Sequence, residues 1–323
     1  MIAKQLLNYI VAPFAYVLSH LRDYWQAEKN YPFALTWFFF VAICVIINYT
    51  FDFETNYIEA HTTYWARVFW YVVMYGFAFY GGLFLYSIFY RKFNFWQDFL
   101  FWLKTLFALI FFSVYVSYDG FYAWIQGNYP YELHYFLMKC AANVVRPVSA
   151  TGILLLFWFI LEPDKTRFYG ISSDKFTAKP YFWMLSVMLP LIVMASFTED
   201  FQQTYPRYHP SLAEDYLQWP FWKTSLIFEF CYGIDFVFVE LFFRGFLVLG
   251  FARWLGVGTI AAMVPMYVFI HFQKPLGETI GSFWGGWILG VLAYRTQSIW
   301  GGVIAHLGVA WLMEIAAIFQ LKF

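Results

Sequence analysis

Long apolar stretches separated by short polar segments dominate this chain. A helix needs about 20 apolar residues to cross the hydrocarbon core of a bilayer. On that basis the pattern predicts spans at 33–50, 66–90, 96–118, 146–162, 181–197, 224–252, 257–271, 277–294 and 298–320. The last four are joined by very short turns, so we expect them to pack as adjacent antiparallel helices. The predicted fold is all-α, a polytopic transmembrane helical bundle with about eight or nine spans.

Residues 5–21 are also apolar, but Tyr9, Pro13, Tyr16 and His20 interrupt them. No small-residue cleavage site follows, so we predict no cleavable signal peptide. The favoured interpretation of this segment is an amphipathic helix lying in the membrane interface, and the alternative is a short extra span.

The composition supports a membrane protein. The chain is 62% hydrophobic and 26% aromatic but only 12% charged, whereas a soluble globular protein has about 25% charged residues. So few charges could not cover a water-facing surface of this size. The net charge of zero argues against nucleic acid as a partner. Cys44, Cys140 and Cys231 lack any motif spacing, so we expect buried free thiols.

Loop charges alternate in sign and predict the orientation. One set of loops carries Lys4, Arg22, Lys29, Arg91, Lys92, Lys165, Arg167, Lys175 and Lys179; the alternate set carries Asp52, Glu54, Glu59, Glu199, Asp200, Glu214 and Asp215. By the positive-inside rule the N-terminus and the basic loops are cytoplasmic. We expect an integral membrane protein of a bacterial-type plasma (inner) membrane.

Four ionisable residues interrupt the apolar C-terminal third: Glu240, Arg244, His271 and His306. A charge at the bilayer centre costs roughly 2.5–3.5 kcal/mol on insertion scales, so such residues usually face a protein interior or a wet cavity. At about 1.5 Å per residue, Glu240, His271 and His306 lie within roughly 10 Å of one level. We therefore expect a common hydrated chamber. The alternative is a self-neutralising Glu240–Arg244 pair at i and i+4, with histidines satisfied in the core.

The motifs around these residues resemble a known family. Residues 238–245 read Phe-Val-Glu-Leu-Phe-Phe-Arg-Gly, residues 267–271 read Tyr-Val-Phe-Ile-His, and residues 300–310 read Trp-Gly-Gly-Val-Ile-Ala-His-Leu-Gly-Val-Ala. In this order and spacing, about residues 220–318 are similar to the CPBP family (CAAX protease and bacteriocin-processing, or Abi) of intramembrane endopeptidases. Its pattern is Glu-Glu-x-x-x-Arg, then Phe-x-x-x-His, then His-x-x-x-Asn or Asp. The resemblance implies a protease core at 216–323 after an accessory transmembrane region at 1–215.

The matched residues carry the implied chemistry. Glu240 and Arg244 match the second Glu and the Arg, Tyr267 stands for the Phe, and His271 and His306 match the two histidines. The resemblance implies hydrolysis of a peptide bond in a membrane-associated protein or peptide, by water that Glu or Asp and His activate without a cofactor. The last His and Asn would stabilise the oxyanion.

Two positions depart from the pattern. Val239 stands at the first Glu and Ala310 at the last Asn. Asp235 precedes Val239 by four residues and Glu314 follows Ala310 by four, so each shares a helix face with the position it could replace. We hypothesise a site shifted outward by about one turn, around 6 Å, with Asp235 or Glu240 as base. The alternative is a catalytically inactive homologue that binds or scaffolds membrane proteins.

Other interpretations stay open. His271 and His306 with Glu240 or Glu314 could hold zinc, since two histidines and a carboxylate are a known zinc set. No His-Glu-x-x-His pair is present to favour it. A small transporter is less favoured, because broken-helix and repeat signatures are missing. The oligomeric state is open.

Two further patterns concern packing. Gly281, Gly285, Gly286 and Gly290 form small-xxx-small pairs, which predict close helix approach. The Tyr- and Trp-rich segment 201–222 predicts an aromatic belt at the outer interface.

Overall fold

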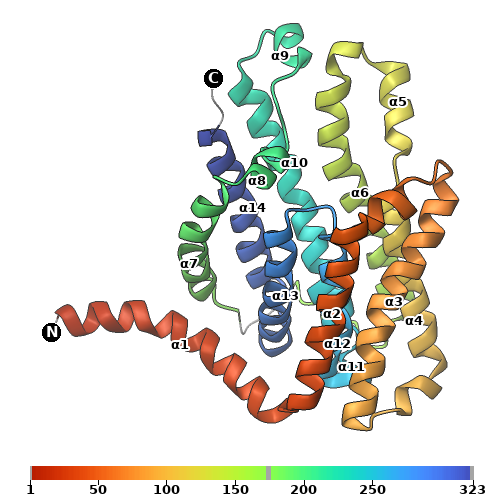
Figure 1. Ribbon diagram of the computed structural model, residues 1–323, viewed down its shortest axis with the longest axis vertical. Coiled ribbons are helices and arrows are strands. Elements are labelled where there is room, and N and C mark those ends of the chain that lie inside the picture. Colours follow the sequence, from red (N-terminus) through yellow and green to blue (C-terminus); the bar gives the residue numbers. More distant parts are fainter. Residues whose placement is uncertain (1, 172–175, 321–323) are drawn as a thin grey trace. The chain divides into compact units, whose positions relative to one another are not determined.

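The computed structural model describes residues 2–171 and 176–320, with side chains from residue 12 onward. Every regular element in these ranges is a helix, which confirms the all-α prediction (Figure 1). The α-helices are α1 (Ile2–Glu28), α2 (Tyr31–Phe51), α3 (Tyr64–Tyr90), α4 (Phe99–Ser117), α5 (Gly120–Asn128), α6 (Tyr131–Leu161), α7 (Lys179–Ala195), α8 (Glu199–Thr204), α9 (Leu212–Leu217), α10 (Phe221–Glu240), α11 (Ala252–Leu255), α12 (Thr259–Phe269), α13 (Leu276–Thr296) and α14 (Trp300–Gln320). The π-helices are η1 (Glu54–Glu59) and η3 (Leu241–Leu249), and the 3₁₀ turns are η2 (Asn94–Gln97) and η4 (Gly256–Gly258).

Within the described residues, five helical stretches are long and apolar enough to cross a membrane: Tyr31–Phe51, Tyr64–Tyr90, Phe99–Asn128, Tyr131–Leu161 and Trp300–Gln320. Lys179–Ala195 is apolar but shorter. These helices make the chain an integral membrane protein with a polytopic bundle. The particular membrane and the orientation stay predictions.

The other predicted spans differ from the structure. The stretch 224–252 is interrupted, because α10 gives way to the π-helix η3 at Leu241. The stretch 257–271 forms only the 11-residue α12. The 21-residue α13 is long enough, but its glycines and Glu278 lower its hydropathy. Residues 5–21 lie within the helix α1, which is not among the five spans, and its interfacial position stays a prediction.

The chain folds into two compact units, each built from three separate stretches. Unit 1 comprises Met1–Ser117, Tyr169–Pro180 and Phe242–Gly301; unit 2 comprises Tyr118–Phe168, Tyr181–Leu241 and Gly302–Phe323. The predicted division at 215/216 stays a prediction.

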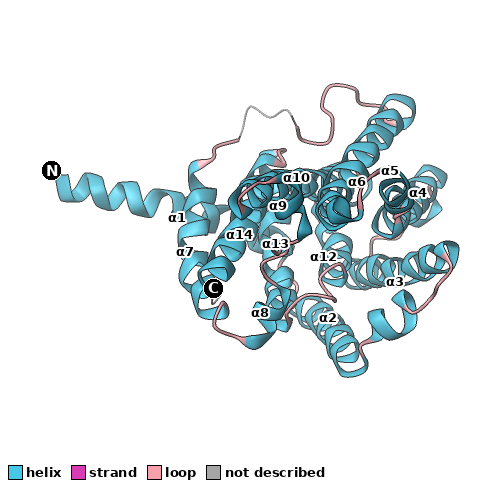
Figure 2. Cartoon of the chain, turned by 90° about the horizontal axis from the view of Figure 1, so that it is seen from above, coloured by secondary structure: helices cyan, strands magenta, loops and turns pink. Residues whose placement is uncertain are grey.

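The buried helix α12 lies at the centre of unit 1 and packs against α2, α3 and α13 (Figure 2). The Trp37 indole Nε1–H from α2 donates to the Ala261 carbonyl at 2.9 Å. On α3, a Cβ at Gly82 would lie 3.0 Å from Pro265 Cγ and closer still to the Ala261 carbonyl. Glycine is therefore required where these two helices cross.

The glycines of α13 divide into two sets. A Cβ at Gly286 would lie 2.9 Å from the Tyr267 ring, and one at Gly290 would lie 2.8 Å from Met263, so these two allow the predicted close approach to α12. A Cβ at Gly281 or Gly285 would meet no atom within 4 Å. The prediction is wrong for these two, because among the described residues no atom lies close enough to require a glycine there.

A buried lysine ends the π-helix η3. The Gly250 N–H donates to the Gly245 carbonyl at 2.9 Å, an i→i−5 bond. The Gly250 carbonyl accepts from Lys104 Nζ of α4 at 2.6 Å. This ammonium also lies 4.9–5.7 Å from the centroids of four rings, those of Tyr169, Phe246, Phe251 and Trp254. A cation at a helix C-terminus stabilises its carbonyls, and the surrounding rings add cation–π attraction.

In unit 2, α10 packs along α6. One apolar cluster of this unit contains Phe136, Tyr208, Ala213, Phe228, Tyr232 and Ala310. The aromatic residues of segment 201–222 have two environments: Tyr205 and Tyr208 are buried, whereas Tyr216, Trp219 and Trp222 are exposed. Only the exposed ones fit the predicted belt. Cys44, Cys140 and Cys231 are free, and Cys231 is buried.

Candidate active site

Glu240 and His306 form a buried hydrogen-bonded pair in unit 2. Glu240 is the last residue of α10 and is fully buried, and His306 lies two turns into α14 with 16% of its side chain exposed. Their Oε1 and Nδ1 atoms are 3.0 Å apart. A carboxylate accepts, so Nδ1 carries the proton of this bond. Phe236, one turn before Glu240, packs edge-on against the imidazole at 4.6 Å.

Gly302 makes the approach of α14 to Glu240 possible. A Cβ at this position would lie 2.7 Å from the Glu240 Cδ and closer still to its Oε2. Any other residue would displace either the carboxylate or the helix. The glycine pair in the family-like Trp300-Gly301-Gly302 motif thus has a steric role beside Glu240.

His271 is held by the backbone of its own turn in unit 1. It is buried in the turn after α12, and its Nδ1 lies 2.8 Å from the Tyr267 carbonyl. A carbonyl only accepts, so Nδ1 donates here as well. The Tyr267 ring packs against the His271 ring at 4.8 Å.

Arg244 lies on the π-helix η3, where its fully buried guanidinium stacks 4.1 Å from the centroid of the Tyr267 ring. Tyr267 therefore contacts both Arg244 and His271. The predicted i,i+4 relation of Glu240 and Arg244 assumed a continuous α-helix. The α-helix ends at Glu240 and π-helical spacing follows, and the pairing of Glu240 with Arg244 stays a prediction.

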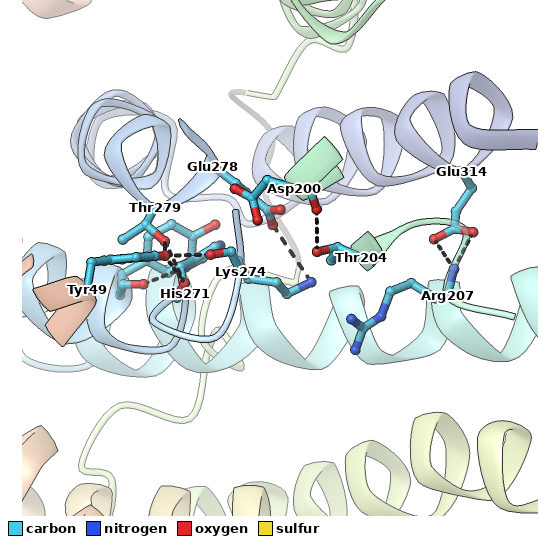
Figure 3. Close-up of polar contacts among 10 residues, drawn as sticks. Tyr49, Asp200, Thr204, Arg207, His271, Lys274, Glu278, Thr279 and Glu314 are labelled. Carbon is cyan, nitrogen blue, oxygen red and sulfur yellow. Dashed lines mark hydrogen bonds and ion pairs between the residues drawn. The ribbon is translucent and has the colours of Figure 1, made fainter. Parts of the chain in front are cut away.

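The residues of the hypothesised shifted site have other surroundings. Both carboxylate oxygens of Glu314 accept the backbone N–H of Arg207, at 3.1 and 2.9 Å (Figure 3). Glu314 follows His306 by eight residues, about 12 Å along α14. Asp235 is half-buried and precedes Glu240 by five residues, which rotates it by about 140°. Their role in catalysis stays a prediction.

Both departures from the family pattern are buried. Ala310 packs in the apolar cluster with Tyr232 and Phe136, and Val239 is buried on α10. In the described part of the chain, no three His, Cys, Asp or Glu side chains lie close enough together to hold a metal ion. The zinc alternative stays a prediction.

A second polar cluster lies in unit 1, between α2 and α3. The hydroxyl of Tyr71 contacts both Glu54 Oε1, at 3.0 Å, and Glu59 Oε1. One hydroxyl has a single proton to donate, so one of these carboxyls must itself carry a proton to make the second bond. Burial raises the pKa of the Glu54 carboxyl to about 7, with the nearby Glu59 charge adding to the shift and the Tyr71 hydrogen bond opposing it. The raised pKa makes Glu54 the carboxyl better suited to hold this proton.

Sequence reasoning missed several contributors. Gly302 and Phe236 flank the Glu240–His306 pair, and Asn48 and Tyr49 of α2 contact the turn that carries His271. The only sequence signal for the α2 residues is a polar pair at the end of an apolar span.

Comparison with known families agrees with the motif analysis. Residues 220–312 match the sequence model described as type II CAAX prenyl endopeptidase Rce1-like. The match includes Glu240, Arg244, His271 and His306, and it confirms the resemblance to the CAAX protease group. No curated protein and no solved structure matches the chain. The region 220–312 is thus Rce1-like, and this similarity supports a CAAX-type intramembrane protease kind of function.

Proposed function

We propose that this protein is an intramembrane endopeptidase that hydrolyses a peptide bond in a membrane-associated protein or peptide. The observation that carries the proposal is the buried Glu240–His306 pair, within the region that matches the CAAX prenyl endopeptidase model. A buried carboxylate that orients an imidazole is an arrangement suited to general-base work.

The geometry suggests a division of roles. Glu240 accepts the Nδ1–H of His306, so Nε2 is the atom that takes a proton from water. The carboxylate then stabilises the imidazolium, and the same Nε2 returns the proton to the leaving amine. This uses the second family Glu instead of the first, whose position Val239 occupies. His271 has its Nδ1 tied to the Tyr267 carbonyl, and this bond orients the ring.

A specific observation favours a second function, that of a catalytically inactive homologue binding membrane proteins. Ala310 stands where the family has an oxyanion-stabilising Asn, and it is packed among Phe136, Phe228 and Tyr232. A methyl group in an apolar cluster cannot donate a hydrogen bond to an oxyanion.

Proteolysis by the purified full-length protein in lipid nanodiscs tests the proposal. The substrates are membrane-anchored peptides, including C-terminally prenylated ones, and mass spectrometry identifies the products. Glu240→Gln and His306→Asn should each lower kcat/KM at least about 100-fold, since positioned acid–base groups contribute 10²–10⁴-fold.

Two variants provide matched controls. Glu229→Gln changes another carboxylate of α10, eleven residues before Glu240, and His134→Asn changes another histidine of unit 2. Both should cleave at the wild-type rate. Cleavage that persists in both Glu240→Gln and His306→Asn would remove the pair from catalysis. Failure of the wild-type protein to cleave any substrate, with specific retention of a membrane partner, would favour the inactive homologue.

A further inference from the structure

The end of α2 is hydrogen-bonded to the turn that carries His271 (Figure 3). The Tyr49 hydroxyl lies 2.5 Å from the Lys274 carbonyl, 2.6 Å from Thr279 Oγ1 and 3.4 Å from the His271 carbonyl. The Thr279 hydroxyl donates to the His271 carbonyl at 2.5 Å. The neighbouring Asn48 donates from Nδ2 to the Phe272 carbonyl at 3.2 Å. Three carbonyls of one short turn are therefore bound by side chains.

These bonds add to those of the turn itself, in which the Lys274 N–H already donates to the His271 carbonyl at 2.9 Å. The turn joins α12 to α13, so its carbonyls lie beyond the last full turn of α12. Leaving a buried carbonyl without a donor costs about 1–3 kcal/mol. Asn48 and Thr279 are buried, so side chains take the place of water here. The backbone of His271 and Phe272 is consequently fixed at consecutive positions.

A fixed backbone at His271 also fixes its ring. The imidazole is already tied through Nδ1 to the Tyr267 carbonyl at the end of α12. Thr279 donates to the carbonyl of His271 and Tyr49 donates to the carbonyl of Lys274, so the main chain cannot rotate without breaking these bonds. Asn48 extends the support, because its Oδ1 accepts the Glu54 backbone N–H at 3.1 Å while its Nδ2 holds Phe272.

We propose that Asn48 and Tyr49 are positioning residues for His271, so that α2, which lies outside the family-like region 220–312, contributes to the active site by holding one turn. This inference rests on the proposed endopeptidase function for its kinetic consequence. Its structural part is independent of that function. Neither side chain touches the reacting atoms in this scheme; both act through the backbone of residues 271–274.

The test compares Tyr49→Phe, which removes only the hydroxyl, with Tyr57→Phe, which removes an exposed hydroxyl between α2 and α3. Hydrogen–deuterium exchange of full-length protein in nanodiscs should be about 10-fold or more faster in peptides covering residues 270–275 of Tyr49→Phe. Exchange in α3 should not change. In the cleavage assay kcat should fall about 10-fold with KM unchanged, because a displaced His271 acts on the reaction and not on substrate binding.

The outcomes separate the two proposals. Unchanged exchange at 270–275 in Tyr49→Phe would overturn the positioning role, whatever the activity. Faster exchange with unchanged kcat would overturn it too, because the turn would then be held without serving His271. If the wild-type protein cleaves nothing, the proposed function fails, and exchange alone decides whether α2 holds the turn. If Tyr49→Phe does not fold, Thr279→Val, which removes the donor to the His271 carbonyl, should speed exchange at residues 270–275 in the same way.

Discussion

Replacing Gly302 with alanine is the most direct perturbation of the Glu240–His306 pair. The added Cβ would lie 2.7 Å from Glu240 Cδ and closer still to Oε2, whereas ordinary contacts lie at 3.4–4 Å. Relief requires a shift of about 0.7 Å or more of the carboxylate or of α14. Glu240 is fully buried in packed protein, so the carboxylate has little room to rotate. We expect its 3.0 Å bond to His306 Nδ1 to be lengthened or broken.

The magnitude follows from the kind of bond lost. A hydrogen bond to a charged group contributes about 1.5–3 kcal/mol, and 1.4 kcal/mol corresponds to a factor of ten in rate. Gly302→Ala should therefore lower kcat/KM by about 10- to 150-fold. The assay is cleavage of a membrane-anchored peptide by protein in nanodiscs, with the unfolding midpoint measured in parallel.

Gly281→Ala provides the matched control. It makes the same chemical change on a transmembrane-region helix, but its Cβ meets no atom within 4 Å, and it should cleave normally. Wild-type kcat/KM in a folded Gly302→Ala protein would refute the reasoning, because catalysis would then tolerate a displaced Glu240. Equal losses in both variants would point to a general effect of alanine on helix packing.

Three other predictions concern the surroundings of the site. Burial raises the pKa of Glu54 from 4.5 to about 7. The protonated Glu54 therefore contributes its full share to the free energy of unfolding below about pH 4.5, and this free energy falls by about 3 kcal/mol as the pH rises to 7. Glu54→Gln should remove the pH dependence of the free energy of unfolding between pH 4.5 and 7, whereas Glu132→Gln, at an exposed position, should keep it. If Glu54→Gln keeps the wild-type pH dependence, another group causes it. Lys104→Met should lower the free energy of unfolding by about 2 kcal/mol in denaturant titrations, because the Gly250 carbonyl loses a charged donor. Lys104→Arg should recover part of this loss. A Lys104→Met protein as stable as the wild type would show that Lys104 does not stabilise the end of η3. Glu314→Leu should speed hydrogen exchange in residues 205–211, since it frees the Arg207 N–H. Glu314→Gln should keep most cleavage activity. If Glu314→Gln loses as much activity as Glu240→Gln, the hypothesised shifted site is supported instead.

Much of the fold was predictable from the sequence because apolar segments of sufficient length have few alternatives to a helix in a membrane. The same logic identified Glu240, Arg244, His271 and His306, since ionisable residues in such segments are costly and need a protein environment. All four are buried or nearly so.

The sequence could not predict contacts that depend on packing. The π-helix after Glu240 is held at its end by Lys104, which is 146 residues before Gly250, so no local sequence pattern indicates this contact. The partner of Glu240 is 66 residues away on α14. Gly281 and Gly286 have the same sequence signature, yet only Gly286 meets a neighbouring helix.

The central place of α12 has a consequence for fragment design. Its neighbours in unit 1 include α2 and α3, which supply the Trp37 indole to the Ala261 carbonyl and the glycine surface at Gly82. A truncated C-terminal piece starting near residue 216 would leave that carbonyl without its indole donor and expose the side of α12 that α3 covers. Such a piece should aggregate or be degraded in cells, and restoring α2 and α3 in trans would be needed to recover a soluble detergent complex.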